Sequence, residues 1–191
     1  MALPEYPMIS VEDYLTLDRN SKEKRYEYFD GELRMLAGGS TYHSTIMINV
    51  TSLLHGLLRG SNCRVHGSDM RVQLSKTRYV FPDATVTCDQ RDHEFGDILR
   101  YPKVVIEVLS PSTEATDRGK KFTLYRECPT VQEYMMVNTQ DMQVEVYHRN
   151  EGKWTLSPFG PGSVIELESL NIRFPIEEVY EGLNLTQDLE N

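Results

Sequence analysis

A carboxylate inside an apolar run is the residue in this sequence that most needs a chemical explanation. Glu107 interrupts the run V-V-I-E-V-L within Lys103–Ser110, which is typical of a strand covered on both faces. Burial of an ionised carboxylate without a partner costs several kcal/mol or more. The sequence leaves three explanations open: Glu107 holds a cation, pairs with a base, or lies at the strand end and faces water.

A second carboxylate, Asp83, opens the preceding strand region, Tyr79–Cys88. The connection Asp89–Tyr101 carries no apolar pattern of helix length, so we expect the two strands to pair antiparallel rather than through a parallel crossover. If the two ends of that connection lie side by side, Asp83 falls opposite Glu107 and both carboxylates meet at one end of the sheet. Taken alone, Asp83 would be an ordinary acid at a strand start.

Two converging carboxylates suit a hard divalent cation, because Mg²⁺ in proteins binds one or two carboxylates together with waters and phosphate oxygens. Such a metal can polarise a phosphodiester and deliver an activated water. Asp117, Lys121 and Tyr125 follow at i, i+4 and i+8 of a predicted helix over 114–127, so they share one helix face. The helix leaves directly from the strand of Glu107, which could direct Lys121 to the metal site, where it would hold the attacking water or neutralise developing charge. The alternative for Asp117 and Lys121 is a surface salt bridge.

The elements that must position these residues alternate along the chain. Ser10 and either Ser40 or Thr41 are the predicted N-caps of two further helices. Asp30-Gly31 predicts the turn of a hairpin over Arg25–Ala37. We therefore expect an α/β or α+β domain with a mixed β-sheet core flanked by helices. The predicted helices span 11–18, 40–59 and 114–127, with a helical turn at 175–180, and the remaining predicted strands span 63–66, 70–74, 133–138, 142–148, 153–156, 164–167 and 172–174.

Length and composition bound the class of protein. The chain has 191 residues, 39% hydrophobic and 26% charged, which predicts one globular domain over 1–191 with a core at about 11–180 and a loose tail at 185–191. It contains neither an apolar run of membrane-span length nor a secretory signal pattern, so we expect a cytoplasmic protein without membrane contact. Its three cysteines, Cys63, Cys88 and Cys128, are predicted to be reduced. The net charge of −9 argues against coating of nucleic acid by bulk electrostatics but allows a local basic groove.

Four stretches of the sequence resemble the Uma-type family of putative restriction endonucleases. They are R-Y-E-Y-F-D-G-E-L, F-P-D-A-T-V, V-V-I-E-V-L-S-P-S-T and D-R-G-K-K-F-T-L-Y, and the likeness covers roughly Val11 to Tyr180. That family was long catalogued as a domain of unknown function and belongs to the PD-(D/E)XK nuclease superfamily. The resemblance implies a restriction-endonuclease-like fold and metal-dependent hydrolysis of phosphodiester bonds, with Mg²⁺ or Mn²⁺ as the cofactor.

The resemblance also implies roles for individual residues. Asp83 matches the aspartate of the family's P-D motif and Glu107 the acid of its second motif, and the backbone carbonyl of Val108 would be a further metal ligand. The chain departs from the superfamily pattern at Leu109, where lysine is usual. In the Uma-type family that lysine looks to have moved to the next helix, where this chain has Lys121.

Further candidates have ordinary alternatives of about equal or greater weight. Glu27, in R-Y-E-Y, matches an N-terminal acid of the family but could be a surface glutamate of the hairpin. His43 lies near a position where the family often has a histidine, but alone it is more often a capping or surface residue. Five cations could line a phosphate-binding edge or simply be solvated charges: Arg71, Lys76, Arg78, Arg118 and Lys120.

Three classes of function therefore compete. The first is a Mg²⁺-dependent endonuclease that acts on DNA, with Asp83, Glu107 and Lys121 in the site, Glu27 as an auxiliary, and a homodimer expected by analogy so that two sites meet two strands. The second is a non-catalytic nucleic-acid-binding or regulatory module on the same fold. The third is a purely structural interaction protein. Metal binding separates the first class from the third, and cleavage that disappears on Asp83→Ala separates the first from the second.

Overall fold

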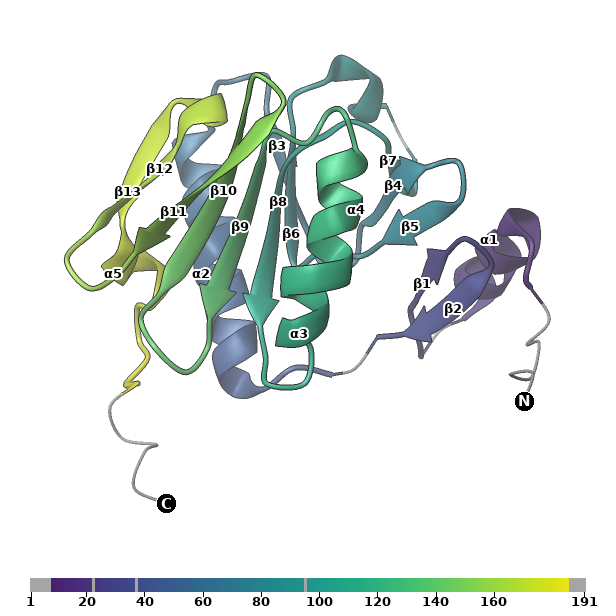
Figure 1. The fold of residues 1–191 in the computed structure, drawn as a ribbon, viewed down its shortest axis with the longest axis horizontal. Coiled ribbons are helices and arrows are strands. Elements are labelled where there is room, and N and C mark those ends of the chain that lie inside the picture. The colour runs from purple at the N-terminus through teal and green to yellow at the C-terminus, as the bar shows by residue number, and fades with distance from the viewer. Residues whose placement is uncertain (1–7, 22, 37, 95, 186–191) are drawn as a thin grey trace.

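A six-stranded mixed sheet forms the centre of the computed structural model, which describes residues 8–21, 23–36, 38–94 and 96–185 (Figure 1). The strand order is β11-β10-β9-β8-β6-β3. Strands β8 and β9 run parallel, because a helical crossover joins them, and the other neighbours are antiparallel. The predicted mixed sheet is confirmed. In the order given, the strands span Lys153–Phe159, Val144–Asn150, Glu133–Asn138, Pro102–Leu109, Ala84–Thr87 and Arg64–Gly67.

Helices cover both faces of this sheet. Helix α2 (Thr41–Leu57) lies behind it in Figure 1, and the crossover helix lies in front. The side chains of β8 alternate between the two cores: Val104, Ile106 and Val108 pack on the α2 side, and Val105 and Leu109 pack on the crossover side. The predicted burial of this strand on both faces is confirmed. The crossover consists of α3 (Glu114–Thr116), a π-helical turn η2 (Asp117–Lys121) and α4 (Phe122–Glu127).

A smaller five-stranded sheet, in the order β2-β1-β5-β4-β7, stands beside the central one at the right of Figure 1. The predicted hairpin is confirmed, and its turn residues Asp30 and Gly31 have φ of 51° and 104°, which glycine adopts without strain. Helix α1 (Val11–Asn20) begins at the predicted cap Ser10 and packs on this sheet. The strands span Glu32–Met35, Tyr26–Phe29, Arg78–Val80, Arg71–Ser75 and Ile98–Leu99 in the order given.

The prediction of one strand over 79–88 is wrong. The chain leaves β5 after Val80, and residues 81–83 carry it across to β6 in the central sheet. The predicted loop at 89–101 also contains structure, a 3₁₀ turn η1 (Gln90–Asp92) and the short strand β7, which pairs parallel with β4. Both sheets therefore meet at the segment that carries Asp83.

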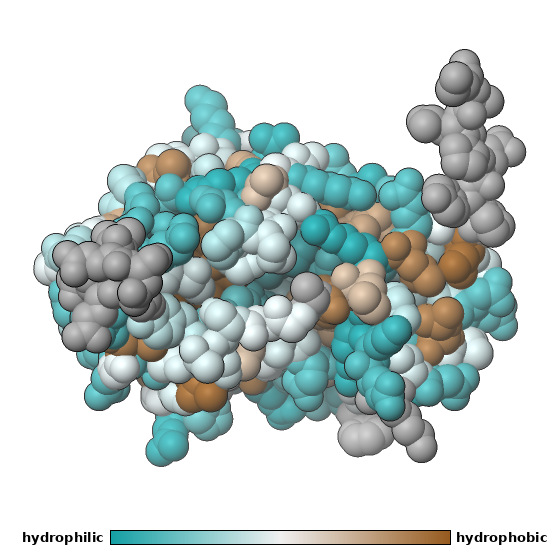
Figure 2. Space-filling view, turned by 90° about the horizontal axis from the view of Figure 1, so that it is seen from below, coloured by the Kyte–Doolittle hydropathy of each residue, from teal (hydrophilic) through white to brown (hydrophobic). Residues whose placement is uncertain are grey.

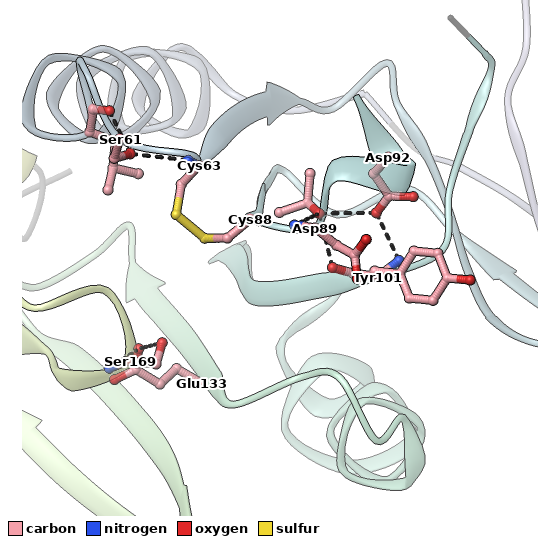
Figure 3. The surroundings of a disulfide bond; sticks show 10 residues. Ser61, Cys63, Cys88, Asp89, Asp92, Tyr101, Glu133 and Ser169 are labelled. Atoms are coloured by element: carbon pink, nitrogen blue, oxygen red, sulfur yellow. Dashed lines mark hydrogen bonds between the residues drawn. A yellow bond between two sulfur atoms is a disulfide. The ribbon is translucent and has the colours of Figure 1, made fainter. Parts of the chain in front are cut away.

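The C-terminal part packs a two-stranded ribbon against the α2 side of the central sheet. The ribbon consists of β12 (Val164–Leu167) and β13 (Ile172–Pro175), and α5 (Ile176–Val179) follows it. A 3₁₀ turn between the strands, η3 (Glu168–Leu170), is tied to β9 because Ser169 donates a hydrogen bond to the buried Glu133 carboxylate (Figure 3). Leu185 packs against the core. The rest of the predicted loose tail, 186–191, lies outside the described residues.

The cysteine prediction is wrong for two of the three residues. Cys63 and Cys88 form a disulfide bond, which joins the start of β3 to the end of β6 (Figure 3). Cys128 is a free, buried thiol, as predicted. No helix among the described residues is both long enough and apolar enough to cross a membrane.

Candidate active site

The register between β6 and β8 brings Asp83 to the end of the strand that carries Glu107. Ala84 lies beside Ile106, as predicted, so the next position outward on β6 is Asp83 and the next on β8 is Glu107. Asp83 has already left the strand, and its Oδ2 accepts a 2.7 Å hydrogen bond from the backbone N–H of Val108. This bond fixes the Asp83 carboxylate at the edge of the central sheet.

Glu107 is 3% exposed and points to the crossover side of the sheet. Its Oε1 accepts hydrogen bonds from Lys121 Nζ at 2.9 Å and from the Tyr125 hydroxyl at 2.5 Å. Of the three explanations for this residue, the position facing water is therefore wrong, and pairing with a base is confirmed. Its Oε2 has no hydrogen-bond partner among the described residues, which leaves that oxygen for a ligand.

Lys121 lies at the centre of a buried acidic cluster. Besides Glu107, its ammonium lies 3.1 Å from Glu27 Oε1 and 3.5 Å from Asp117 Oδ1. Glu27 and Asp117 are 1% and 2% exposed, so a surface glutamate and a surface salt bridge are both excluded. Glu27 reaches this cluster from β1 of the smaller sheet, where it also lies 3.4 Å from the backbone nitrogen of Phe81.

The charges of the cluster do not balance. Burial raises the pKa of Glu107 to about 8 against the effect of Lys121, and burial also raises the pKa of Asp117. Although burial opposes it, the carboxylates of Glu107 and Glu27 hold the pKa of Lys121 above its ordinary value. The ammonium of Lys121 thus contacts three carboxylates, those of Glu27, Glu107 and Asp117, and Asp83 adds a fourth acidic group close to Glu107 and Asp117. Such a site favours a proton or an added cation.

His43 lies at the start of α2, where its backbone N–H donates to the cap residue Ser40. Its Nε2 is 3.2 Å from Asp83 Oδ2, and this hydrogen bond raises the pKa of the imidazole against the opposing effect of burial. The interpretation of His43 as a plain capping or surface residue is therefore excluded, because its side chain contacts a candidate ligand.

One open cavity of about 580 Å³ is lined by His43, Asp83, Glu107, Asp117 and Lys121. Glu27 and Tyr125 belong to the same cluster but do not line the cavity. Figure 2 shows the face of the molecule that carries the start of α2 and the end of β8, with hydrophilic residues gathered around a central hollow. The cavity wall further includes Glu23, Lys24, Arg25, Gly39 and Ser110.

The donor set around the cavity fits a hard cation held by few protein ligands. Among residues 8–21, 23–36, 38–94 and 96–185, no group of three or more His, Cys, Asp or Glu side chains converges on one metal position. The candidates named from the sequence are two carboxylates, Asp83 and Glu107, and the carbonyl of Val108. An all-oxygen set of this size is what Mg²⁺ uses when waters and phosphate complete its shell.

Four of the five cations that could line a phosphate-binding edge lie beside carboxylates of the protein itself. Arg71 is 2% exposed and bound to carboxylates of the protein itself, and three of the other four cations also lie beside carboxylates. Lys76, on the turn between β4 and β5, is exposed and remains outside these pairs. The pairs join Arg71 to Asp18 and Asp97, Arg78 to Asp30 and Glu127, Arg118 to Glu114 and Glu145, and Lys120 to Glu32.

Comparison with known proteins agrees with this fold. The Uma2 family model, described as "Putative restriction endonuclease", matches residues 11–177. Two proteins of Synechocystis sp. are similar over nearly their whole length: "Uncharacterized protein slr1290" is 39% identical over 93% of this chain and 94% of its own, and "Uncharacterized protein sll1609" is 27% identical over 90% and 99%. A crystal structure of a putative nuclease belonging to DUF820 from Anabaena variabilis has the same fold, with a TM-score of 0.75, 20% identity, and coverage of 90% of this chain and 97% of its own.

Proposed function

The chain belongs to the Uma2 family, and from this premise and the geometry of its cavity we propose that it is a metal-dependent endonuclease that hydrolyses phosphodiester bonds of DNA. One observation carries the proposal: Lys121, from the crossover helix, reaches Glu107 of β8 at the cavity that Asp83 also lines. An acid, a second acid and a lysine around one cleft are the groups that metal-assisted phosphodiester hydrolysis needs.

The cofactor we propose is Mg²⁺ or Mn²⁺. Asp83, Glu107 and the carbonyl of Val108 would hold it, and the excess of carboxylates over cations in the cluster favours its uptake. When bound, the metal supplies the polarisation of the phosphodiester and the activation of a water.

The protein's own groups prepare this chemistry. Tyr125 and Lys121 both donate to Glu107 Oε1, so they fix the orientation of that carboxylate. Glu27 and Asp117 also contact the ammonium of Lys121, and these contacts restrict the motion of the lysine side chain. From there Lys121 would orient the attacking water or neutralise charge on the phosphate.

DNA is the proposed substrate, and a homodimer the proposed assembly, so that two sites would cut two strands. Because the net charge is −9, binding would rely on local cations, and Lys24 and Arg25 of the cavity wall would supply them. The cytoplasm remains our proposed location, although the Cys63–Cys88 disulfide removes reduced cysteines as an argument for it.

The test is cleavage of plasmid and single-stranded DNA at low salt with Mg²⁺ or Mn²⁺. We expect the wild type to cut and both Glu107→Gln and Lys121→Ala to lose about 100-fold or more of the rate, the size typical for loss of one electrostatic group. Glu166→Gln is the matched control, because Glu166 lies outside the cavity in an exposed ion pair with Arg173.

The outcomes separate the competing classes. Cutting that survives both cavity variants would mean a contaminant or a misplaced site. If the wild type retains DNA but neither cuts it nor takes up metal in calorimetry, the chain is a non-catalytic nucleic-acid-binding module. If the wild type neither retains DNA, nor cuts it, nor takes up metal, the chain is a structural interaction protein.

A further inference from the structure

The two hydrogen bonds on Asp83 converge on the same carboxylate oxygen. Oδ2 accepts the Val108 N–H at 2.7 Å and lies 3.2 Å from His43 Nε2. Oδ1 has no hydrogen-bond partner among the described residues. Two donors on one oxygen fix the rotation of the carboxylate and leave the other oxygen for a ligand.

The imidazole of His43 is in turn held by a glycine. A Cβ at Gly39 would lie 2.8 Å from His43 Nδ1 and 3.0 Å from Cγ, closer than a side chain tolerates. Gly38, the preceding residue, has open space where its Cβ would be. Neither glycine has the positive φ that would itself forbid alanine. The backbone therefore approaches the His43 ring closely at Gly39 and not at Gly38.

We propose that Gly39 and His43 form a positioning device for Asp83, in which the glycine seats the imidazole and the imidazole sets which carboxylate oxygen a metal meets. This inference deepens the proposed function and rests on it. His43 is here a positioning residue that acts through a hydrogen bond, so a side chain that keeps an N–H donor at similar reach replaces it.

The test compares His43→Ala, His43→Gln, Gly39→Ala and Gly38→Ala by calorimetric titration of Mn²⁺ and by DNA cleavage. We expect His43→Ala and Gly39→Ala to weaken Mn²⁺ binding by about 10-fold, the loss typical when a group that orients a metal ligand is removed. His43→Gln should recover most of the affinity, and Gly38→Ala should match the wild type.

Three results would overturn the device: Gly39→Ala that binds Mn²⁺ like Gly38→Ala, His43→Ala with wild-type affinity, or His43→Gln as weak as His43→Ala. The last result would identify His43 as a direct participant. If the wild type binds no metal and cuts no DNA, the proposed function fails and the device fails with it; if the wild type binds and cuts but the variants do not follow the pattern, only the device fails.

A second cavity, of about 430 Å³, lies at the other end of α2 and carries cations without acids. Its charged and titratable lining residues are His55, Arg59, Arg64 and His66, and no carboxylate lines it. Within the described part of the chain neither arginine pairs with a carboxylate; Arg64 donates only to the carbonyl of His93. Seven other arginines of this acidic protein are ion-paired, whereas these two line a cavity with their charges unpaired by carboxylates.

A buried polar atom in the same cavity wall also lacks a partner. His66 Nε2 is enclosed and has no hydrogen bond among the described residues. Buried polar atoms in native proteins are nearly always bonded, and His66 lines the same cavity as the two arginines. Guanidinium groups suit planar or tetrahedral oxyanions because they donate two parallel hydrogen bonds.

We infer that this second cavity binds a phosphate group, which either the backbone of a nucleic acid or a free phosphorylated compound could supply. The inference is independent of catalysis. His43 and His55 are twelve positions apart on α2, which separates the two cavities by about 18 Å along the helix, so one extended strand of nucleic acid could reach both.

The probes are inorganic phosphate and pyrophosphate in calorimetry and duplex DNA in a salt series, with Arg59→Ala, Arg64→Ala and the double variant. Arg126→Ala is the control, since Arg126 lies outside both cavities. We expect wild-type phosphate binding that weakens about 10-fold or more in the double variant. Loss of DNA affinity with a salt slope reduced by about 2 identifies a backbone phosphate as the ligand. Unchanged DNA binding with lost phosphate binding identifies a free compound, and no change in either measurement overturns the site.

Discussion

Replacement of Glu107 by glutamine should abolish the proposed activity and at the same time stabilise the fold in neutral and mildly alkaline solution. The substitution keeps the shape of the side chain and the acceptor oxygen that Lys121 and Tyr125 contact. What it removes is a carboxylate that is buried at 3% exposure among other carboxylates.

The magnitude follows from the pKa of Glu107, which burial raises from its ordinary value of 4.5 to about 8. Between those two values the unfolded chain has released the proton and the folded protein has kept it, so the stability of the wild type falls as the pH rises, by about 1.4 kcal/mol per pH unit. Glutamine has no proton to lose. The free energy of unfolding of Glu107→Gln relative to wild type should therefore increase by about 3 kcal/mol from about pH 5.5 to pH 8.

The assay is urea unfolding of wild type and Glu107→Gln across this pH range, with EDTA present so that bound metal does not contribute. Glu166→Gln, an exposed carboxylate in an ion pair, should show a difference from wild type that is small at every pH. A gap between Glu107→Gln and wild type that does not change with pH, or a variant less stable than wild type at pH 8, would refute the reasoning.

Three further outcomes are expected. Arg71→Ala leaves two carboxylates without their buried partner and should lower the free energy of unfolding by about 3–5 kcal/mol in urea denaturation. His148 is 8% exposed, and its hydrogen bond to Glu133 raises the pKa of the imidazole. The contribution of this bond to stability is therefore complete below about pH 6.5 and is lost as the pH rises through the raised pKa. The stability deficit of His148→Gln in thermal unfolding should accordingly shrink as the pH rises above about 6.5. Cys63→Ser should cost about 3 kcal/mol in oxidising buffer and nothing in reducing buffer, because the bond to Cys88 closes a loop across 25 positions; equal stability of variant and wild type in oxidising buffer would mean that the bond does not form.

The alignment of the two carboxylates could be predicted because it depends on local rules. The length and polarity of the loop at 89–101 indicated antiparallel pairing, and the position of the loop indicated the register, which holds from Ala84 to Val86 before a bulge at Thr87. The apolar run around Glu107 likewise gave a strand covered on both faces. Each of these inferences used residues adjacent in sequence or paired across one turn.

The same counting would have found the disulfide, had the partner of β3 been known. Arg64 pairs with Thr87, so the next positions outward are Cys63 and Cys88. The spacing of the cysteines alone carried no such signal, because β3 and β6 are separated by the whole of the second sheet's β4 and β5. Pairing between strands distant in sequence is set by packing, which a single sequence does not state.

The same limit explains why the pairing of Arg71 and the burial of Glu27 could not be predicted. Arg71 looked like a surface cation in an alternating strand, but its partner Asp18 lies on α1, 53 positions away. Glu27 looked like an outward hairpin residue, but its strand forms part of a second sheet, and its side chain is buried against Lys121 of the crossover. Buried ion pairs between separate layers were outside the reach of local patterns in both cases.

The position of Lys121 shows how the crossover helix places an ammonium beside a carboxylate of the strand that precedes it. Leu109, at the position where the superfamily has lysine, is 2% exposed and packs in the core on the same side of β8 as Glu107. Lys121 supplies the ammonium from η2 instead, at 2.9 Å from Glu107. In a regular helix of 3.6 residues per turn, Asp117 and Tyr125 would point about 80° apart. The wider π turn over Asp117–Lys121 takes up part of that rotation, so Asp117 stays on the helix face of Lys121 and Tyr125. Lys121 and Tyr125 are four positions apart, so they share this face and both contact the Glu107 carboxylate.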